Sequence, residues 1–319
     1  PPMQNVEELE INTGPVTIRG KRWRQDGGIP TLCLHGFLDN AASFDLLAPK
    51  LKGLDLFAMD FAGHGLSDHR PLGAPYTGLS DLHEILSVAD HLGWTTFSVI
   101  GHSMGAELGA QLAGLFPDRV RALVCLDGYC GTNTIEQTLD HLSSMVTSAS
   151  ARSSKLKVFD SLSAMAERLS EATGQSLESA QLLVARGHRS VPGGYTWRAD
   201  SRVRGGGPLE LTADQLRALA DTTKARTAVI LADIESEWLK RSLKVILNPV
   251  PSTMEIAHIP AHHHFHMHAE HEVLAEMIST FLAGEKLPGA LSAEGYRQLS
   301  DTVNETGVHI SRLAGHLNA

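Results

Sequence analysis

Short apolar runs that alternate with helical patterns dominate residues 31 to 130, and they constrain the fold most. The runs are TLCLH at 31–35, LDLFAMDF at 54–61, TTFSVIG at 95–101 and RALVCLDG at 121–128. Amphipathic helical spacing fills two of the intervals, and two further strand-like runs follow at 226–233 and 252–259. Such alternation is typical of parallel strands joined by crossover helices. The sequence therefore predicts an α/β domain with a mostly parallel sheet.

The stretch VIGHSMGAELG at 99–109 leaves one of these strands and enters a helix. It places Ser103 between Gly101 and Gly105. A tight turn from strand to helix strains the serine backbone and leaves no room for side chains at the two flanking positions, so glycine is required there. The turn presents the serine oxygen beside the N–H groups of the helix N-terminus. This pattern favours Ser103 as a nucleophile over a simple turn residue.

A serine nucleophile also needs donors that hold the oxyanion formed during its attack. The first central strand ends at His35 and Gly36, and a loop follows. We expect the backbone N–H of Phe37 in this loop, together with that of Met104 after the serine, to form the oxyanion hole.

Histidines that can act as the base crowd into IPAHHHFHMHAEHE, between the last strand and the last core helix. The segment has five histidines between positions 262 and 268. Imidazoles also bind zinc, copper and nickel, so a metal site is the alternative interpretation. We expect no metal and no cofactor, because neither a cysteine pair nor an HExxH arrangement accompanies the cluster.

The motifs HGFLDNAASFDLLAP, DFAGHGLSD, GHSMGA and the histidine segment, in this order, resemble an α/β-hydrolase of the serine hydrolase-like family. The resemblance runs from about residue 10 to residue 284, and it extends to RGHRSVPGGYTWRADSRVR at 186–204. It implies the α/β-hydrolase fold, with a mostly parallel central sheet and a helical cap inserted after the strand that follows the nucleophile helix. The family's histidine context selects His263 as the base, and His262 and His264 stay open because a slip of one position separates them.

The resemblance leaves the acid of the triad with three candidates. Many α/β-hydrolases carry it after the strand that precedes the histidine strand, where this chain reads ADIESEW with Glu235 in register and Asp233 two residues earlier. This departs from the family's Gly-x-x-Asp pattern. The related haloalkane dehalogenases carry the acid after the strand that follows the elbow helix, where this chain has Asp127. We expect Asp127 first, then Glu235, then Asp233.

Strand-like apolar runs and helical patterns are distributed unevenly, and they divide the chain into three parts. We expect a hydrolase core over 1–130 and 225–284, and a helical cap without strands over 131–224. An amphipathic helical pattern follows over 285–319. This tail is expected to pack onto its own body, with a homodimer contact as the alternative.

The cap is expected to cover the pocket and to select the substrate. Apolar positions of the 134–165 region are expected to line an acyl pocket. Trp197, Arg198, Asp200 and Arg202 form a polar run near the return to the core. We interpret this run as a structural ion-pair network rather than as a substrate clamp.

Charge and composition exclude several classes of partner. The formal net charge is −9, and the sequence has no basic patch, so nucleic acid is not an expected ligand. No stretch is long and apolar enough for a membrane span, and the opening PPMQNVEELE lacks the pattern of a secretory signal. The three cysteines have no regular spacing and predict buried free thiols. A cytoplasmic location is expected.

The expected reaction is hydrolysis of a carboxylic ester, or of a thioester or lactone, because a serine stands where the dehalogenases and epoxide hydrolases of this fold use aspartate. The substrate is a small molecule with a small or medium apolar acyl group. A carbon–carbon bond hydrolase or a cofactor-free lyase on the same residues is one alternative. A ligand-binding protein with little or no turnover is another.

Overall fold

The computed structural model describes residues 6–150, 157–233 and 237–304. Its central sheet has eight strands in the order β1-β2-β4-β3-β5-β6-β9-β10. They are β1 (Val6–Asn12), β2 (Thr17–Trp23), β3 (Ile29–Leu34), β4 (Leu54–Met59), β5 (Phe97–His102), β6 (Val120–Leu126), β9 (Arg226–Leu231) and β10 (Met254–His258). The strands from β3 onward are mutually parallel, which confirms the expected α/β sheet.

The antiparallel hairpin β1–β2, which joins the sheet through β4, was not expected from the sequence. Its outer strand reads VEELEIN, and only Ile11 in it is buried. An edge strand of this kind carries charged residues where a central strand is apolar, because one side of it faces solvent. It therefore lacks the continuous apolar run that identifies the inner strands.

Helices cover both faces of the sheet, because successive strand residues point to opposite sides. Leu32 and Leu34 of β3 join the buried cluster beneath one set of helices, and Cys33 joins the other cluster. The first set is α1 (Gly78–His91), α2 (Met104–Leu115), α6 (Ala213–Thr222), α7 (Glu237–Ile246) and α9 (Ala293–Asn304). The opposite face carries α8 (His271–Leu282). The three cysteines are buried and free, as expected.

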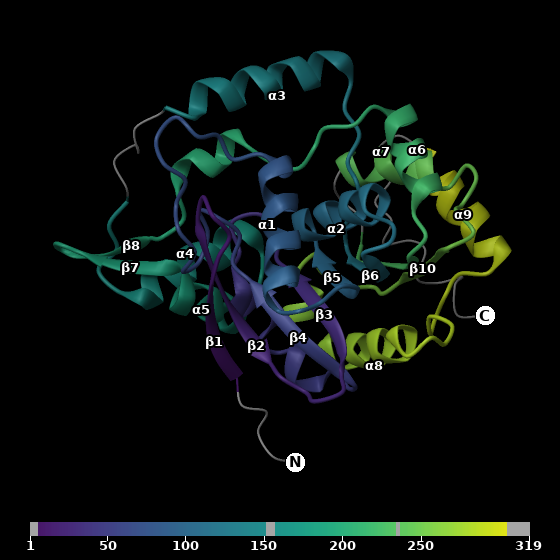
Figure 1. Cartoon of the computed structure of the whole chain (residues 1–319), viewed down its shortest axis with the longest axis horizontal. Coiled ribbons are helices and arrows are strands. Elements are labelled where there is room, and N and C mark those ends of the chain that lie inside the picture. The colour runs from purple at the N-terminus through teal and green to yellow at the C-terminus, as the bar shows by residue number, and fades with distance from the viewer. Residues whose placement is uncertain (1–5, 151–156, 234–236, 305–319) are drawn as a thin grey trace.

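The segment that we expected to form the cap lies between β6 and α6 in the chain and contains α3 (Ile135–Ser148), α4 (Leu162–Thr173) and α5 (Leu177–Gly187). The expectation of a cap without strands was wrong. A hairpin of β7 (His188–Val191) and β8 (Gly194–Trp197) follows α5, turning at Gly193 with φ 85°. Its strands have four residues each, too few to produce a recognisable alternation. Figure 1 shows α4, α5 and the hairpin together, with α3 apart from them.

A buried ion pair, a more exposed one and a hydrogen bond join the expected cap segment to the core. Arg186 of α5 contacts Asp60 after β4 at 2.9 Å and Glu8 of β1 at 2.7 Å. The amide of Asn40 donates to the carbonyl of Leu183 at 2.9 Å. These contacts fix the end of α5 directly beside the carboxyl ends of the strands.

The tail packs onto the core, as expected for its described part. In α9, Leu299 and Val303 are buried in the core cluster that includes α7. The backbone N–H of Ile256 donates to the hydroxyl of Tyr296 at 3.1 Å. Residues 305–319 of the expected helical pattern lie outside the described residues, and the homodimer contact stays a prediction. Among the described helices, none has both the length and the apolar character that a bilayer crossing requires.

Candidate active site

The strand-to-helix turn at Ser103 has the geometry that the glycine spacing predicts. Ser103 follows β5 directly and precedes α2, with φ 51° and ψ −115°. A Cβ at Gly105 would lie 2.0 Å from the carbonyl oxygen of Leu34, and a Cβ at Gly101 would lie 2.3 Å from the carbonyl oxygen of Gly105. Because backbone atoms cannot move aside cheaply, only glycine fits at either position.

Asp127 and His263 form the closest histidine–carboxylate contact at this edge of the sheet. Asp127 follows β6, the neighbour of β5, and its Oδ2 lies 2.5 Å from Nδ1 of His263. Its Oδ1 accepts a hydrogen bond from the backbone N–H of Ala232 at 3.0 Å. Since a carboxylate only accepts hydrogen bonds, Nδ1 of His263 carries the proton and Nε2 is free to accept one.

Burial of His263 opposes its protonation, but the hydrogen bond and the negative charge of Asp127 outweigh it. The pKa of His263 is therefore raised above its usual value. The same interaction fixes the orientation of the ring, as the acid does in a serine–histidine–acid arrangement.

The other candidates for acid and base make different contacts. Asp233 lies 3.1 Å from Nε2 of His258 at the end of β10, and Glu235 lies outside the described residues. His264, next to His263 in the chain, faces Asp39 instead of Asp127. The ring of His262 stacks at 6.2 Å from that of His268.

The neighbourhood of Ser103 brings His263 close to the nucleophile turn. The ring of His102 lies 4.7 Å from that of His263, and its Nε2 lies 3.0 Å from the carbonyl oxygen of His263. A Cβ at Gly128 would lie 2.7 Å from the carbonyl oxygen of Ser103, so the segment after Asp127 also packs on this turn. Within the described residues, Ser103 Oγ and His263 form no hydrogen bond. Such bonds are often loose in structures without substrate and tighten when it binds.

The expected oxyanion donors lie at the ends of β3 and β5. Met104 is the first residue of α2, so its N–H has no intrahelical partner. Phe37 stands in the loop after β3, where the next residue, Leu38, has a left-handed backbone with φ 64°. Across the described ranges, neither N–H donates to another backbone group outside regular elements. Both donors therefore remain available for a ligand.

A cavity of about 610 Å³ lies between the cap and this edge of the sheet. Its apolar lining includes Phe37, Leu169, Leu183 and Trp197. Apolar positions of the 134–165 region were expected to line the pocket, but from this region the described lining includes only Lys157. Figure 1 shows α3, which lies in that region, apart from α4 and α5. Of the residues expected as nucleophile, acid, base and oxyanion donors, Phe37 is the one in the described lining of this cavity. Another cavity, of about 680 Å³, has a mostly charged lining that includes none of them.

Two residues of the polar run near the return to the core, Asp200 and Arg202, form an ion pair as expected. The carboxylate of Asp200 accepts from Arg202 at 2.7 Å and from the hydroxyl of Tyr76 at 2.8 Å. Arg202 also donates to the backbone carbonyl oxygens of Arg70 and Pro71. Trp197, which we had assigned to the same network, lines the cavity.

Sequence reasoning missed a second buried group below His263, which consists of Asp39, His102 and His264. Asp39 stands in HGFLDN and His102 in GHSMG, so both lay inside motifs that we had interpreted through their other residues. Their distance from one another along the chain gave no sign that they meet. The useful signal was that each follows a predicted parallel strand, since such strand ends share one edge of the sheet.

Comparison with known proteins matches this architecture. Residues 30–195 match the model of the α/β hydrolase fold family. Human serine hydrolase-like protein 2 is 32% identical over 305 residues, covering 87% of this chain and 94% of that protein. A serine hydrolase-like protein of Danio rerio is 34% identical over 225 residues, covering 67% and 68%. The crystal structure of a hypothetical protein of Pseudomonas aeruginosa superposes with a TM-score of 0.77 at 34% identity, covering 87% and 99%.

Fold, elbow and relatives together define the class of protein as an α/β hydrolase. Within that class, the chain belongs to the serine hydrolase-like family. The resemblance drawn from the sequence motifs is thereby confirmed.

Proposed function

We propose that this chain hydrolyses carboxylic esters through an acyl-enzyme formed on Ser103, with His263 as the base and Asp127 as the acid of the triad. The observation that carries the proposal is the 2.5 Å contact between Asp127 and His263, at the sheet edge where Ser103 ends β5. Membership of the serine hydrolase-like family supports a hydrolase. The ester substrate and the residue roles are our inference.

In the acylation step, Nε2 of His263 takes the proton of Ser103 as the oxygen attacks the ester carbonyl carbon. The carbonyl π electrons move to oxygen, and the N–H groups of Phe37 and Met104 hold the resulting oxyanion. When the tetrahedral intermediate collapses, the bond to the alkoxy oxygen breaks. The proton on His263 passes to that oxygen, and the alcohol leaves.

In the deacylation step, His263 takes a proton from a water molecule that attacks the acyl carbon. Collapse of the second intermediate breaks the bond to Ser103, and the proton returns to the serine oxygen. Asp127 keeps its charge throughout and stabilises the imidazolium that forms twice in each turnover.

The cavity between cap and core suits an ester with an apolar acyl part. Its volume of about 610 Å³ is within the range of pockets that hold small molecules. Leu169 and Ala172 of α4 and Leu183 of α5 line it together with Trp197. Such side chains stabilise an acyl chain by removing its apolar surface from water.

The test is steady-state hydrolysis of p-nitrophenyl esters of increasing acyl length by the wild-type protein and by Ser103→Ala. We expect hydrolysis with a preference for certain acyl lengths, and a fall in kcat of at least about 10⁴-fold in the variant. Ser98→Ala is the matched control. Ser98 lies on β5, the strand that leads to Ser103, and it is buried. Among the described residues its hydroxyl has no hydrogen-bond partner. It should retain wild-type kcat.

A fluorophosphonate probe separates the remaining interpretations, because it labels an activated serine without requiring turnover of an ester. Labelling of Ser103 without ester hydrolysis would favour a carbon–carbon bond hydrolase or lyase on the same residues. Absence of both labelling and hydrolysis in folded protein would contradict the proposal and favour a ligand-binding protein.

A further inference from the structure

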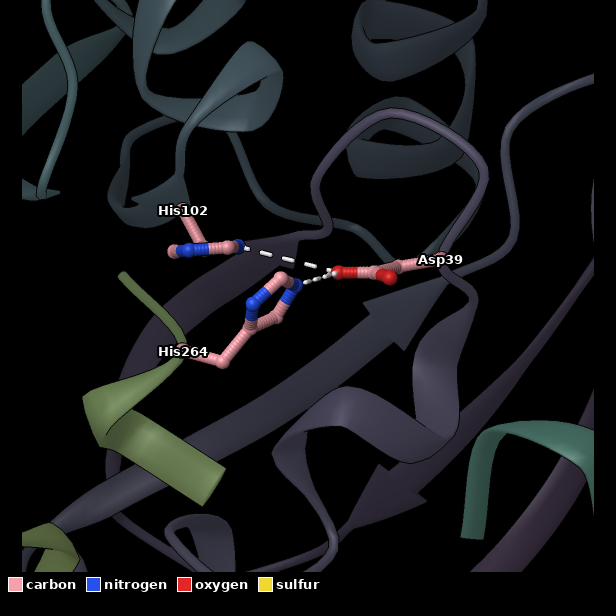
Figure 2. A group of neighbouring side chains, drawn as sticks. All are labelled: Asp39, His102 and His264. Atoms are coloured by element: carbon pink, nitrogen blue, oxygen red, sulfur yellow. Dashed lines mark ion pairs between the residues drawn. The ribbon is translucent and has the colours of Figure 1, made fainter. Parts of the chain in front are cut away.

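A second group of side chains that could bind a metal ion lies beside the proposed base, His263. It consists of Oδ2 of Asp39, Nδ1 of His102 and Nε2 of His264, and all three atoms lie within 4.8 Å of one another. Asp39 Oδ2 is 3.8 Å from His102 Nδ1 and 3.5 Å from His264 Nε2. Figure 2 shows both imidazoles facing the same carboxylate oxygen from different elements of the fold.

Two of these atoms, one on Asp39 and one on His102, are buried without hydrogen-bond partners among the described residues. Asp39 Oδ2 and His102 Nδ1 are inaccessible to solvent and have no hydrogen-bond partner among the described residues. The side chain of His102 is 1% exposed and that of Asp39 is 7% exposed. Buried polar groups are paired in most native structures, because an unpaired one loses its hydration without compensation. An unpaired set of this kind therefore calls for a missing partner.

The tautomer of His102 indicates what kind of partner is missing. Nε2 of His102 lies 3.0 Å from the carbonyl oxygen of His263, which can only accept, so Nε2 carries the proton. A neutral ring then presents a bare lone pair at Nδ1, facing the carboxylate of Asp39. Two lone pairs that face each other are stabilised by a positive charge between them, which either a proton or a metal ion can supply.

The chain leaves space for an ion beside these atoms. A Cβ at Gly36 would lie 2.8 Å from His102 Nδ1 and 3.1 Å from Asp39 Oδ2. Glycine at this position therefore keeps open the volume that both ligand atoms border. Asp39 and His264 also line the 610 Å³ cavity, which supplies an entry path from the solvent.

We propose that Asp39, His102 and His264 bind one divalent transition-metal ion of the zinc class. Tetrahedral zinc with ligands at about 2.0–2.1 Å separates them by about 3.4 Å from each other. The two distances from Asp39 Oδ2, 3.5 and 3.8 Å, are close to this value, and the two imidazole nitrogens, which lie within 4.8 Å of each other, must move closer together when the ion binds. Imidazole and carboxylate are ligands that zinc accepts, and three protein ligands leave a fourth position open to water. The proposal takes up the metal-site alternative that the histidine-rich segment raised in the sequence.

The ion would hold the segment that carries the proposed base. His102 donates its other N–H to the carbonyl of His263, as metal-bound histidines usually do toward a backbone or carboxylate oxygen. His264 follows His263 in the chain. Metal binding thus fixes the backbone that directly follows the His263 ring, and it should raise the thermal stability of the protein. This inference does not rest on the proposed ester hydrolysis.

The test is titration of chelator-stripped, full-length protein with Zn²⁺ by calorimetry, together with thermal unfolding. We expect about one tight site per chain and a melting temperature that rises with Zn²⁺ concentration. Asp39→Asn and His264→Gln should weaken binding by more than about 100-fold, since removal of outer-shell partners alone costs 10- to 100-fold. His268→Gln is the control, because it removes a neighbouring histidine of the same segment and should keep the tight site.

Co²⁺ provides a readout on the wild-type protein that does not depend on the folding of any variant. We expect visible absorption of the intensity typical of four-coordinate Co²⁺, abolished by competing Zn²⁺. Equal affinity in Asp39→Asn and wild type would overturn the proposal in favour of adventitious surface histidines. Lack of tight binding by the wild type would overturn it as well. Neither result involves ester turnover, so failure of this site is distinguishable from failure of the proposed function.

Discussion

His263 and His264 are consecutive residues, yet each faces a different carboxylate in a different way. His263 Nδ1 lies 2.5 Å from Asp127, whose second oxygen accepts a backbone N–H. His264 Nε2 lies 3.5 Å from Asp39, whose Oδ2 has no hydrogen-bond partner among the described residues. The first pair is complete by itself, and the second is not. The role of a buried carboxylate is therefore best inferred from the hydrogen-bond donors and cations that surround it.

The largest expected effect is on the completed pair. Asp127→Asn should lower kcat for a p-nitrophenyl ester by about 10⁴-fold, because the amide favours the wrong tautomer of His263 while the packing stays intact. Asp233→Asn is the matched control, since that carboxylate pairs with His258. It should stay within about threefold of wild type. Equal losses in the two variants would contradict the assignment of the acid.

The second-largest effect is expected at Asp60, a buried carboxylate whose cation, Arg186, comes from α5. Arg186→Met should lower the free energy of unfolding by about 3 to 5 kcal/mol, because it leaves Asp60 charged, buried and without its cation. Urea denaturation measures this change. The double variant Arg186→Met with Asp60→Asn should recover much of the loss, and absence of recovery would show that packing dominates.

Glu107, in the first turn of α2, has a carboxylate that accepts one hydrogen bond, from the backbone N–H of Gly131 at 2.9 Å. In its number of partners it lies between Asp127 and Asp39. Burial raises its pKa to about 8, so between about pH 5 and 8 the folded state keeps a proton that the unfolded state releases. Stability should therefore fall as pH rises through this window, with a slope of at most about 1.4 kcal/mol per pH unit. Glu107→Gln should remove this contribution. Parallel pH profiles of unfolding for the two proteins would contradict it.

The smallest effect is expected for the incomplete pair in metal-free protein. Asp39→Asn should change the free energy of unfolding by less than about 1 kcal/mol, because little hydrogen bonding is lost with the charge. Urea denaturation in the presence of a chelator checks this value. A loss as large as that expected for Arg186→Met would mean that the imidazoles alone satisfy Asp39.

The parallel strands and the elbow were predictable because their signals are local. Apolar runs identify the parallel strands of the central sheet, and Gly101 and Gly105 reveal a turn in which backbone atoms approach closely. Asp127 and His263 were predictable only through a resemblance in chain order. Their contact joins residues 136 positions apart, and nothing between them in the sequence indicates it.

The missed features depend on relations that a linear pattern does not contain. The hairpins β1–β2 and β7–β8 lie at edges or in the cap, where exposure removes the alternation of buried residues. Asp39 and His264 meet because two loops converge at one sheet edge, and each alone resembles an ordinary loop residue. Ion pairs between cap and core, such as Arg186 with Asp60, depend on how α5 docks.

Three residues without the freedom of glycine have positive φ in the described chain: Leu38 at 64°, Ser103 at 51° and Asp127 at 43°. Each follows a strand that ends at the active site, and such a conformation costs of order 1–3 kcal/mol. Glycine would relieve this strain at every one of these positions. At Asp127, however, glycine would also leave the buried N–H of Ala232 without its acceptor. In a gene copy released from selection for chemistry, relief of backbone strain would therefore favour glycine at Ser103 sooner than at Asp127.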